Sequence, residues 1–163
     1  ADKVGPSGFA YGLDISAGML EKARRTAAKL GVKNVEFLES ALEKIPLDSD
    51  SIDLVISNCT LNHAEDKQAV WNEIHRVLRA GGRFAVSDIY SLEEVPEKFR
   101  TDPQAIAECW AGADTKAVYL DTLAKAGFCD VSIIEESAPY EKGEITVVSL
   151  TLQGSKSAGC CCK

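Results

Sequence analysis

The sequence has 163 residues, of which 45% are hydrophobic and 26% charged, a balance typical of one globular domain. Its formal net charge of −7 excludes the basic surface that nucleic acids and acidic membranes require, so we expect neither as a partner. No apolar run approaches the roughly 20 residues that span a bilayer, so we expect a cytoplasmic protein.

The spacing of apolar residues predicts alternating strands and helices along the chain. Short apolar runs bounded by turn residues are typical of strands, and apolar residues recurring at intervals of three and four are typical of helices. The predicted strands are residues 9–15, 35–38, 54–56, 84–86, 131–135 and 145–152. The predicted helices are residues 17–30, 65–79, 103–111 and 116–126.

This order of elements predicts a doubly wound α/β domain. Such a domain has a largely parallel sheet with helices on both faces. A Pro- and Gly-containing turn separates the last two strands and predicts an antiparallel hairpin at the edge of the sheet. We therefore expect one domain over residues 1–153 and a flexible, cysteine-containing tail over residues 154–163.

One motif of such domains is missing from this sequence. The fold binds its nucleotide at a glycine-rich turn after the first strand, and no G-x-G-x-x-G is present. A missing central strand would leave a hole in the sheet unless its neighbours paired directly. We expect the strands that end at Asp14 and Asn58 to flank this gap. We also expect the chain to be a fragment that cannot catalyse turnover alone.

Two of the six cysteines are the strongest candidates for a site. Cys59 lies where a buried apolar strand runs out into a loop, and Cys109 lies on a predicted helix some fifty residues later. Because reduced thiols are expected in a cytoplasmic chain, we expect these two to face one pocket and bind a soft, thiophilic ligand. The alternative is that each is a buried small hydrophobic residue, as most reduced cysteines are.

The remaining cysteines and the histidines are weaker candidates. Cys129 opens a predicted strand and is expected in the core. His63 and His75 are too scattered for a metal site, and neither is assigned a role. Three consecutive cysteines close the tail: Cys160, Cys161 and Cys162. They are either a cluster of soft ligands or an incidental terminus.

These residues resemble class I S-adenosylmethionine-dependent methyltransferases, and within them the arsenite methyltransferases. The wider resemblance is carried by Gly12-Leu13-Asp14-Ile15-Ser16 and by Gly81-Gly82-Arg83-Phe84. The narrower one is carried by Ser57-Asn58-Cys59 and Glu108-Cys109-Trp110-Ala111-Gly112-Ala113, which occur in order and at suitable separation. It covers about residues 3–153.

The resemblance implies S-adenosylmethionine as the cofactor. Asp14 would then accept hydrogen bonds from both ribose hydroxyls, as an acid at the end of a parallel strand can. The alternative is an acid that only complements the dipole of the following helix. The further cofactor-binding residues that the resemblance implies are Ile15, Met19, Ala41, Leu42, Asn58 and Asn62.

The activity that the resemblance implies is methyl transfer to trivalent arsenic held by the thiolates of Cys59 and Cys109. The substrate would be arsenite or its thiol conjugate, with a thiol reductant as partner, and the tail cysteines would be additional arsenic ligands. The family's further N-terminal cysteine ligand is not in this sequence. Two alternatives stay open. One is methylation of a small organic acceptor such as a quinone precursor, and the other is a truncated domain that binds the metalloid without catalysis.

Overall fold

The computed structural model describes residues 1–159 and divides into two compact units, Ala1–Pro46 and Leu47–Lys163. The expectations for Cys160, Cys161 and Cys162 therefore lie outside the described residues. Within the described part, no helix has the length and apolar character needed to cross a membrane.

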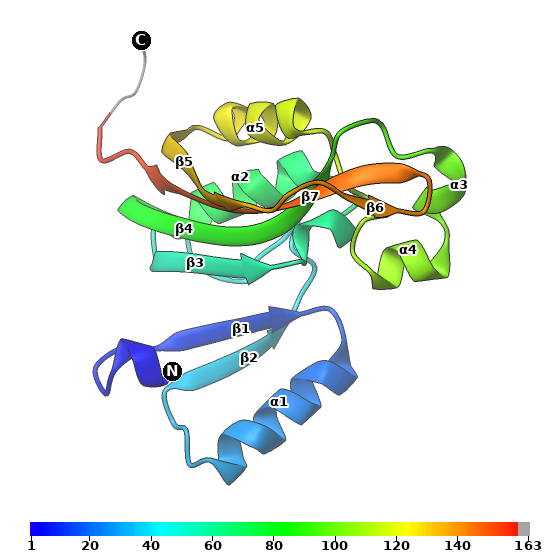
Figure 1. The fold of residues 1–163 in the computed structure, drawn as a ribbon. Coiled ribbons are helices and arrows are strands. Elements are labelled where there is room, and N and C mark those ends of the chain that lie inside the picture. Colours follow the sequence, from blue (N-terminus) through cyan, green and yellow to red (C-terminus); the bar gives the residue numbers. More distant parts are fainter. Residues whose placement is uncertain (160–163) are drawn as a thin grey trace. The chain divides into compact units, whose positions relative to one another are not determined.

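The first unit is a strand–helix–strand segment (Figure 1). Its elements are η1 (Asp2–Val4), β1 (Ala10–Asp14), α1 (Ala17–Lys29) and β2 (Val35–Glu39). The two strands pair in parallel, so their carboxyl ends meet where Asp14 lies opposite Glu39. Helix α1 begins at Ser16, whose hydroxyl accepts a hydrogen bond from the Met19 N–H, and ends before Gly31, whose φ of 67° suits glycine.

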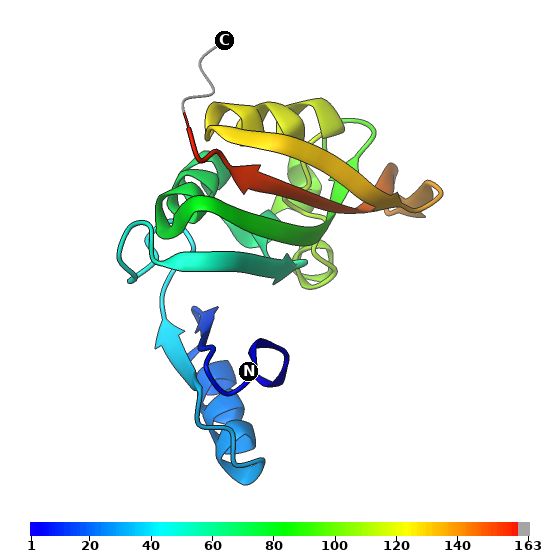
Figure 2. The same cartoon turned by 90° about the vertical axis from the view of Figure 1, so that its left-hand side faces the viewer.

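The second unit is a sheet covered by helices. Its strands are β3 (Ile52–Asn58), β4 (Leu78–Ser91), β5 (Phe128–Glu136), β6 (Tyr140–Lys142) and β7 (Ile145–Lys156). Its helices are η2 (Leu61–His63), α2 (Lys67–Val77), α3 (Glu97–Arg100), α4 (Pro103–Ala107) and α5 (Lys116–Lys125). The strand order is β3-β4-β7-β5, with β6 paired to β7. Helices α2 and α5 contact each other on one face of this sheet (Figure 2).

Aromatic side chains hold α2 and α5 against the sheet. The Trp71 ring of α2 lies 5.0 Å from the Phe84 ring, 6.1 Å from Tyr119 and 5.7 Å from Phe128, measured between ring centroids. These partners come from β4, α5 and β5, so one side chain joins four elements. All four rings are buried, and edge-to-face aromatic pairs add about 0.5–1.5 kcal/mol each beyond the burial of their area.

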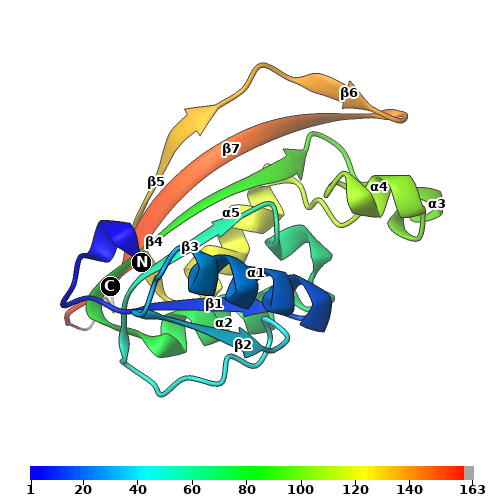
Figure 3. The same ribbon diagram turned by 90° about the horizontal axis from the view of Figure 1, so that it is seen from below.

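The structure confirms the α/β class and the antiparallel hairpin at the edge of the sheet. Strand β5 is outermost in this hairpin, and β7 pairs antiparallel with both β4 and β5. Strand β7 curves alongside β4 from Ser91↔Val147 to Arg83↔Ser155 (Figure 3). The short connection through β6 returns the chain in the opposite direction, so β5 and β7 pair antiparallel. Among the strands described in this unit, only β3 and β4 pair in parallel.

Three predicted boundaries differ. Helix α4 ends at Ala107, so Cys109 is not helical, because its left-handed backbone cannot continue the helix. Strand β4 begins at Leu78, directly after α2, where we expected the helix to continue to residue 79. Strand β7 reaches Lys156, three residues into the predicted tail, since Gly154 lets the Phe84 ring approach the strand closely.

The strands expected to flank a gap do not pair with each other. Among residues 1–159, β1 pairs only with β2, and β3 pairs only with β4. Each strand therefore keeps one edge without a neighbouring strand in the described chain. That the two edges flank a single missing strand stays a prediction.

Candidate functional site

Cys59 directly follows β3, at the carboxyl end of its parallel pair with β4. Its N–H donates to the Ser87 carbonyl at 2.8 Å, which fixes the backbone beside β4. The residue is half-buried and has a φ of 55°, in the left-handed region. That conformation costs a residue with a Cβ roughly 1–2 kcal/mol, so the surrounding structure must hold it there.

Cys109 lies two residues beyond α4 and has the same unusual backbone, with a φ of 64°. Its N–H donates to the Ile106 carbonyl at 2.9 Å, in a turn that closes the helix. The residue is half-buried. In residues 1–159 only four non-glycine residues have positive φ, and two of them are Cys59 and Cys109. Backbone strain of this kind concentrates at functional sites.

Cys59 packs against the buried cluster that contains Trp110 and Ala111, the two residues that follow Cys109. Burial, the hydrogen bond with Cys109 and the negative charge of Asp88 together raise the pKa of the Cys59 thiol to about 12, and burial is the largest of these causes. That the two cysteines face one site stays a prediction, which their proximity supports. Their role as ligands of a soft atom stays a prediction.

Asn62 of η2 fixes Cys109 in place. Its buried side-chain amide donates to the Cys109 carbonyl at 3.0 Å and to the Ile89 carbonyl of β4 at 2.8 Å. The backbone carbonyl oxygen of Asn62 lies close to Gly112. A Cβ on that glycine would be 2.1 Å from this oxygen. Gly112 therefore has to be a glycine, because η2 approaches the backbone at this position. Asn62 joins the loop after Cys59 to the loop that carries Cys109.

His63 is a site residue that the sequence did not reveal. Its Nε2 lies 3.3 Å from the Cys109 Sγ, although the imidazole is exposed. The sequence places His63 four residues after Cys59, which is a local signal for proximity to that residue. Nothing in the local pattern predicts contact with Cys109, because that contact depends on the return of the chain 46 residues later.

Two cavities lie beside the cysteine pair. One, of about 270 Å³, is lined by Cys59 together with hydroxyl groups, among them Ser87, and two acids, Asp88 and Glu135. The other, of about 350 Å³, is lined by Cys109 and His63 with several charged side chains. Each thiol thus borders a different cavity.

Beneath the pair lies a buried acid, Asp88 of β4. Its Oδ1 accepts a hydrogen bond from the Ile89 N–H at 2.9 Å, while its buried Oδ2 has no partner among the described residues. Burial raises the pKa of this carboxyl to about 7, against a smaller opposing effect of the Ile89 N–H and the Lys67 charge. The buried Tyr119 hydroxyl likewise has no partner in the described chain.

The first unit presents the expected cofactor residues at the carboxyl ends of β1 and β2. Asp14 Oδ1 accepts a hydrogen bond from the Ser16 N–H at 2.8 Å, at the start of α1. No hydrogen bond to its second oxygen is present among residues 1–159. The Asp14 carbonyl accepts from the Ser40 N–H at 3.1 Å, which brings the turn containing Ala41 and Leu42 alongside.

The other expected cofactor residues differ in their environment. Ile15 and Met19 expose 74% and 54% of their surface, unusually much for large apolar side chains. Asn58 is exposed and lines the cavity beside Cys59. Asn62 directs both amide donors into the second unit, toward Ile89 and Cys109. Cofactor contact by any of these residues stays a prediction.

Comparison with known proteins identifies the family. A family model described as a methyltransferase domain matches residues 1–127. Arsenite methyltransferase of Halobacterium salinarum is 37% identical over 97% of this chain and 43% of its own length. Demethylmenaquinone methyltransferase of Lactococcus lactis is 40% identical, but over only 51% of this chain and 33% of its own length.

A solved structure extends the likeness to the fold. An arsenic(III) S-adenosylmethionine methyltransferase from Chlamydomonas reinhardtii superposes with a TM-score of 0.82 at 30% identity, over 95% of this chain and 57% of that one. The chain spans less than half the length of the Halobacterium relative. With a family model matching well over half of its residues, the chain belongs to the methyltransferase-domain family, with arsenite methyltransferases among its relatives.

Proposed function

We propose that this chain is the arsenic-holding part of an S-adenosylmethionine-dependent arsenite methyltransferase. One observation carries the proposal: Cys59 packs against the cluster containing Trp110 and Ala111, next to Cys109, and both cysteines are held in left-handed conformations. A pair of thiols suits a thiophilic atom such as trivalent arsenic. The similarity to arsenite methyltransferases along almost the whole chain supports the same substrate.

The residues at the end of β1 fit the proposed cofactor. When bound, S-adenosylmethionine supplies an electrophilic methyl group on a sulfonium. Asp14 has one carboxylate oxygen engaged with the Ser16 N–H, and the other can accept a hydrogen bond from a ribose hydroxyl. Exposed Ile15 and Met19 offer apolar contact to an adenosine, and the turn at Ala41 and Leu42 lies beside them.

The cysteine pair positions the acceptor. Trivalent arsenic bound by two thiolates keeps a lone pair, and that lone pair is the nucleophile, so no side chain has to act as a general base. The protein contributes positioning and soft ligands. Because the pKa of the Cys59 thiol is raised, this thiol is protonated until arsenic replaces its proton.

The cellular setting follows from the same chemistry. Reduced thiols require a reducing compartment, for which we propose the cytoplasm, and a thiol reductant as partner. We keep Cys160, Cys161 and Cys162 as a further proposed arsenic-binding cluster, on the softness of their sulfur atoms alone.

A matched set of cysteine variants tests the proposal. Cys59→Ser and Cys109→Ser each remove one soft ligand, and Cys129→Ser, on β5, is the control with a cysteine outside the pair. We expect arsenite binding, measured by equilibrium dialysis with arsenic detection, to fall on the order of 100-fold in the first two variants. It should stay unchanged in the third.

The two alternatives give different outcomes. A protein that binds S-adenosylmethionine but shows no arsenite binding would point to an organic acceptor, as in the partial match to the menaquinone enzyme. Arsenite binding without any S-adenosylmethionine binding would point to a domain that only holds the metalloid. Unchanged arsenite binding in either Cys59→Ser or Cys109→Ser would remove that residue from the site.

A further inference from the structure

The β6–β7 hairpin packs against the loop that carries the second cysteine, although no motif of the sequence pointed to this hairpin. Tyr140 and Lys142 of β6 pair with Val147 and Ile145 of β7. Ile145 and Val147 belong to the buried cluster that contains Trp110, and Tyr140 packs against the same cluster. Because paired residues and alternate residues along a strand share one face, the Lys142 side chain leaves β6 on the face that covers Trp110.

The turn of this hairpin lies directly on two aromatic rings. It consists of Gly143 and Glu144, and Gly143 has a φ of 58°. A Cβ on Gly143 would lie 3.0 Å from Cη2 of Trp110 and 3.2 Å from Cζ of Phe99. The centroids of these two rings are themselves 5.1 Å apart. A two-residue turn fixes the register of a hairpin, so the position of Lys142 at its start is fixed by the backbone.

The Lys142 side chain contacts the residue that precedes Cys109. Its Nζ lies 2.6 Å from Glu108 Oε2, and each side chain is only about one-third exposed. The same carboxylate oxygen accepts a hydrogen bond from the Trp110 indole N–H at 3.3 Å. The Gln104 amide donates to the other oxygen, Oε1, at 2.9 Å. Three donors from different segments thus hold the Glu108 carboxylate in one orientation.

The loop of residues 108–115, the Cys109 loop, is therefore held from two sides. On one side the Asn62 amide donates to the Cys109 carbonyl at 3.0 Å. On the other side the hairpin holds the residue before Cys109 and the ring of the residue after it. Since Cys109 has a left-handed backbone that its Cβ disfavours, contacts on its two neighbours are what can keep it there.

We propose that Lys142 is a positioning residue for Cys109, and that the tip of the β6–β7 hairpin holds the Cys109 loop through Glu108 in the conformation that binds arsenic. The inference rests on the proposed function and adds to it a residue that does not itself touch the substrate.

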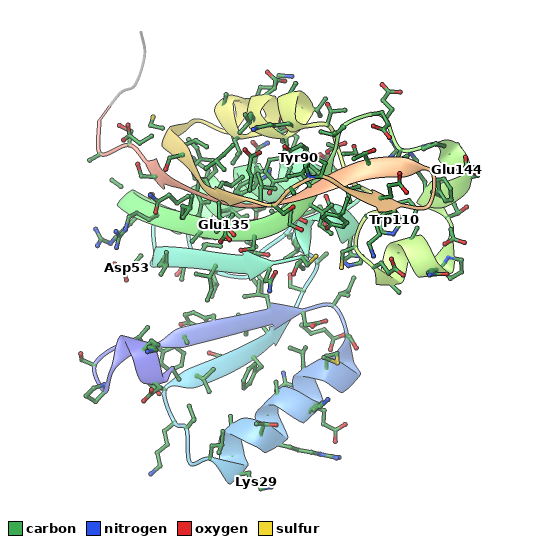
Figure 4. The ribbon with its side chains drawn as sticks, in the orientation of Figure 1. Lys29, Asp53, Tyr90, Trp110, Glu135 and Glu144 are labelled. Carbon is green, nitrogen blue, oxygen red and sulfur yellow. The ribbon has the colours of Figure 1, made fainter. Side chains whose placement is uncertain are left out.

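The same turn supplies a matched control. Lys98 of α3 lies 2.6 Å from Glu144 Oε2, the same separation as in the pair of Lys142 with Glu108. Glu144 and Trp110 are both labelled in Figure 4. The Lys98–Glu144 pair joins the turn to α3 and is more exposed, 55% and 67%, so it should contribute little.

The experiment compares three lysine variants by equilibrium dialysis with arsenite. Lys142→Met removes the ammonium, Lys142→Arg keeps a cation at this position, and Lys98→Met removes the control cation. We expect arsenite affinity to fall about threefold to tenfold in Lys142→Met. It should stay close to the wild-type value in Lys142→Arg and in Lys98→Met.

A double-mutant cycle shows whether Lys142 acts through Glu108. Glu108→Gln should lower arsenite affinity as Lys142→Met does. The double variant should bind no more weakly than the weaker single variant, because both substitutions remove the same contact. Losses that simply multiply would show that Lys142 does not act through Glu108.

Acrylamide quenching of tryptophan fluorescence is a readout that needs no arsenic. The chain has two tryptophans, both buried: Trp71 under α2 and α5, and Trp110 under the hairpin turn. Release of the turn should increase quenching in Lys142→Met, through Trp110, and leave it unchanged in Lys98→Met.

Equal arsenite affinity in wild type and Lys142→Met, or an equal loss in Lys142→Met and Lys98→Met, would overturn the role of Lys142 and leave the proposed function standing. Absence of arsenite binding by the wild-type protein would overturn the proposed function, and the role of Lys142 with it.

Discussion

The two candidate regions of this chain are built in opposite ways. At the end of β1, the residues expected to contact the cofactor are close in sequence, and Ile15 and Met19 are largely exposed. Around Cys59 and Cys109, the groups come from distant segments, and Asn62 joins them through buried hydrogen bonds. The first region presents a surface that a ligand can complete, whereas the second has a geometry that is already fixed. Substitutions should therefore affect binding alone in the first region and folding together with binding in the second.

Gly112→Ala should give the largest effect. The added Cβ would lie 2.1 Å from the Asn62 carbonyl, a backbone atom that cannot move aside without displacing η2. We expect a loss of about 3 kcal/mol or more in the free energy of unfolding, together with weaker arsenite binding. Urea unfolding measures the first quantity and equilibrium dialysis the second.

Gly159→Ala is the matched control, since a Cβ there meets no atom within 4 Å. If Gly112→Ala unfolds at the same urea concentration as this control, η2 and the Cys109 loop do not fit together as tightly as the geometry requires, and the contrast between the regions fails.

Asp88→Asn should change how stability depends on pH. The pKa of Asp88 is raised from 3.8 to about 7 by burial, so the folded state holds this proton more tightly than the unfolded state does. The resulting stabilisation is complete below pH 4 and is lost as the pH rises toward 7. The asparagine has no proton to lose, so the variant should gain about 4 kcal/mol relative to wild type between pH 4 and pH 8.

The readout for Asp88 is urea unfolding at several pH values, because the change with pH is independent of any constant effect of the substitution. Asp53→Asn is the control, an acid on β3 whose side chain is 77% exposed (Figure 4). Parallel pH profiles for wild type and Asp88→Asn would show that the carboxyl is not held protonated beneath the cysteines.

Asp14→Ala tests the other region, where we expect an effect on binding alone. Loss of a charged hydrogen-bond acceptor should weaken S-adenosylmethionine binding by roughly 1.5–3 kcal/mol. Arsenite binding should not change, since the cysteines lie in the other unit. Calorimetric titration with each ligand provides both numbers. An unchanged affinity for S-adenosylmethionine would leave Asp14 only its hydrogen bond at the start of α1.

The same contrast explains what the sequence could predict. The strand that ends at Asp14, the helix capped by Ser16 and the alternation of elements all depend on local spacing, and the structure contains them. The proximity of Cys59 and Cys109 was inferred from two short phrases and the resemblance that they support. Periodicity gave no indication of it, because their contact requires a particular path of the chain between them.

The errors arose where tertiary contacts override local pattern. Residues 103–111 have the composition of a helix, but Asn62 draws the Cys109 carbonyl toward η2 and the helix ends at Ala107. From the sequence His63 received no role, because histidines that are scattered in sequence rarely form a metal site. In the structure His63 contacts a single sulfur atom, that of Cys109, which lies 46 residues later in the chain.

The backbone strain at the cysteines gives the smallest effect and the most direct comparison. At Cys109, with a φ of 64°, glycine should be more stable than alanine by about 1 kcal/mol, because only glycine adopts that conformation freely. Cys129 lies within strand β5 and is not among the described residues with positive φ. There alanine should be more stable than glycine, since glycine weakens a strand. Urea unfolding of the glycine and alanine variants at Cys109 and at Cys129 measures the difference in unfolding free energy at each position. The same sign of this difference at both positions would show that Cys109 is not strained. Opposite signs at the two positions would mean that the fold alone holds Cys109 in an unfavourable conformation, through the packing of η2 against the Cys109 loop.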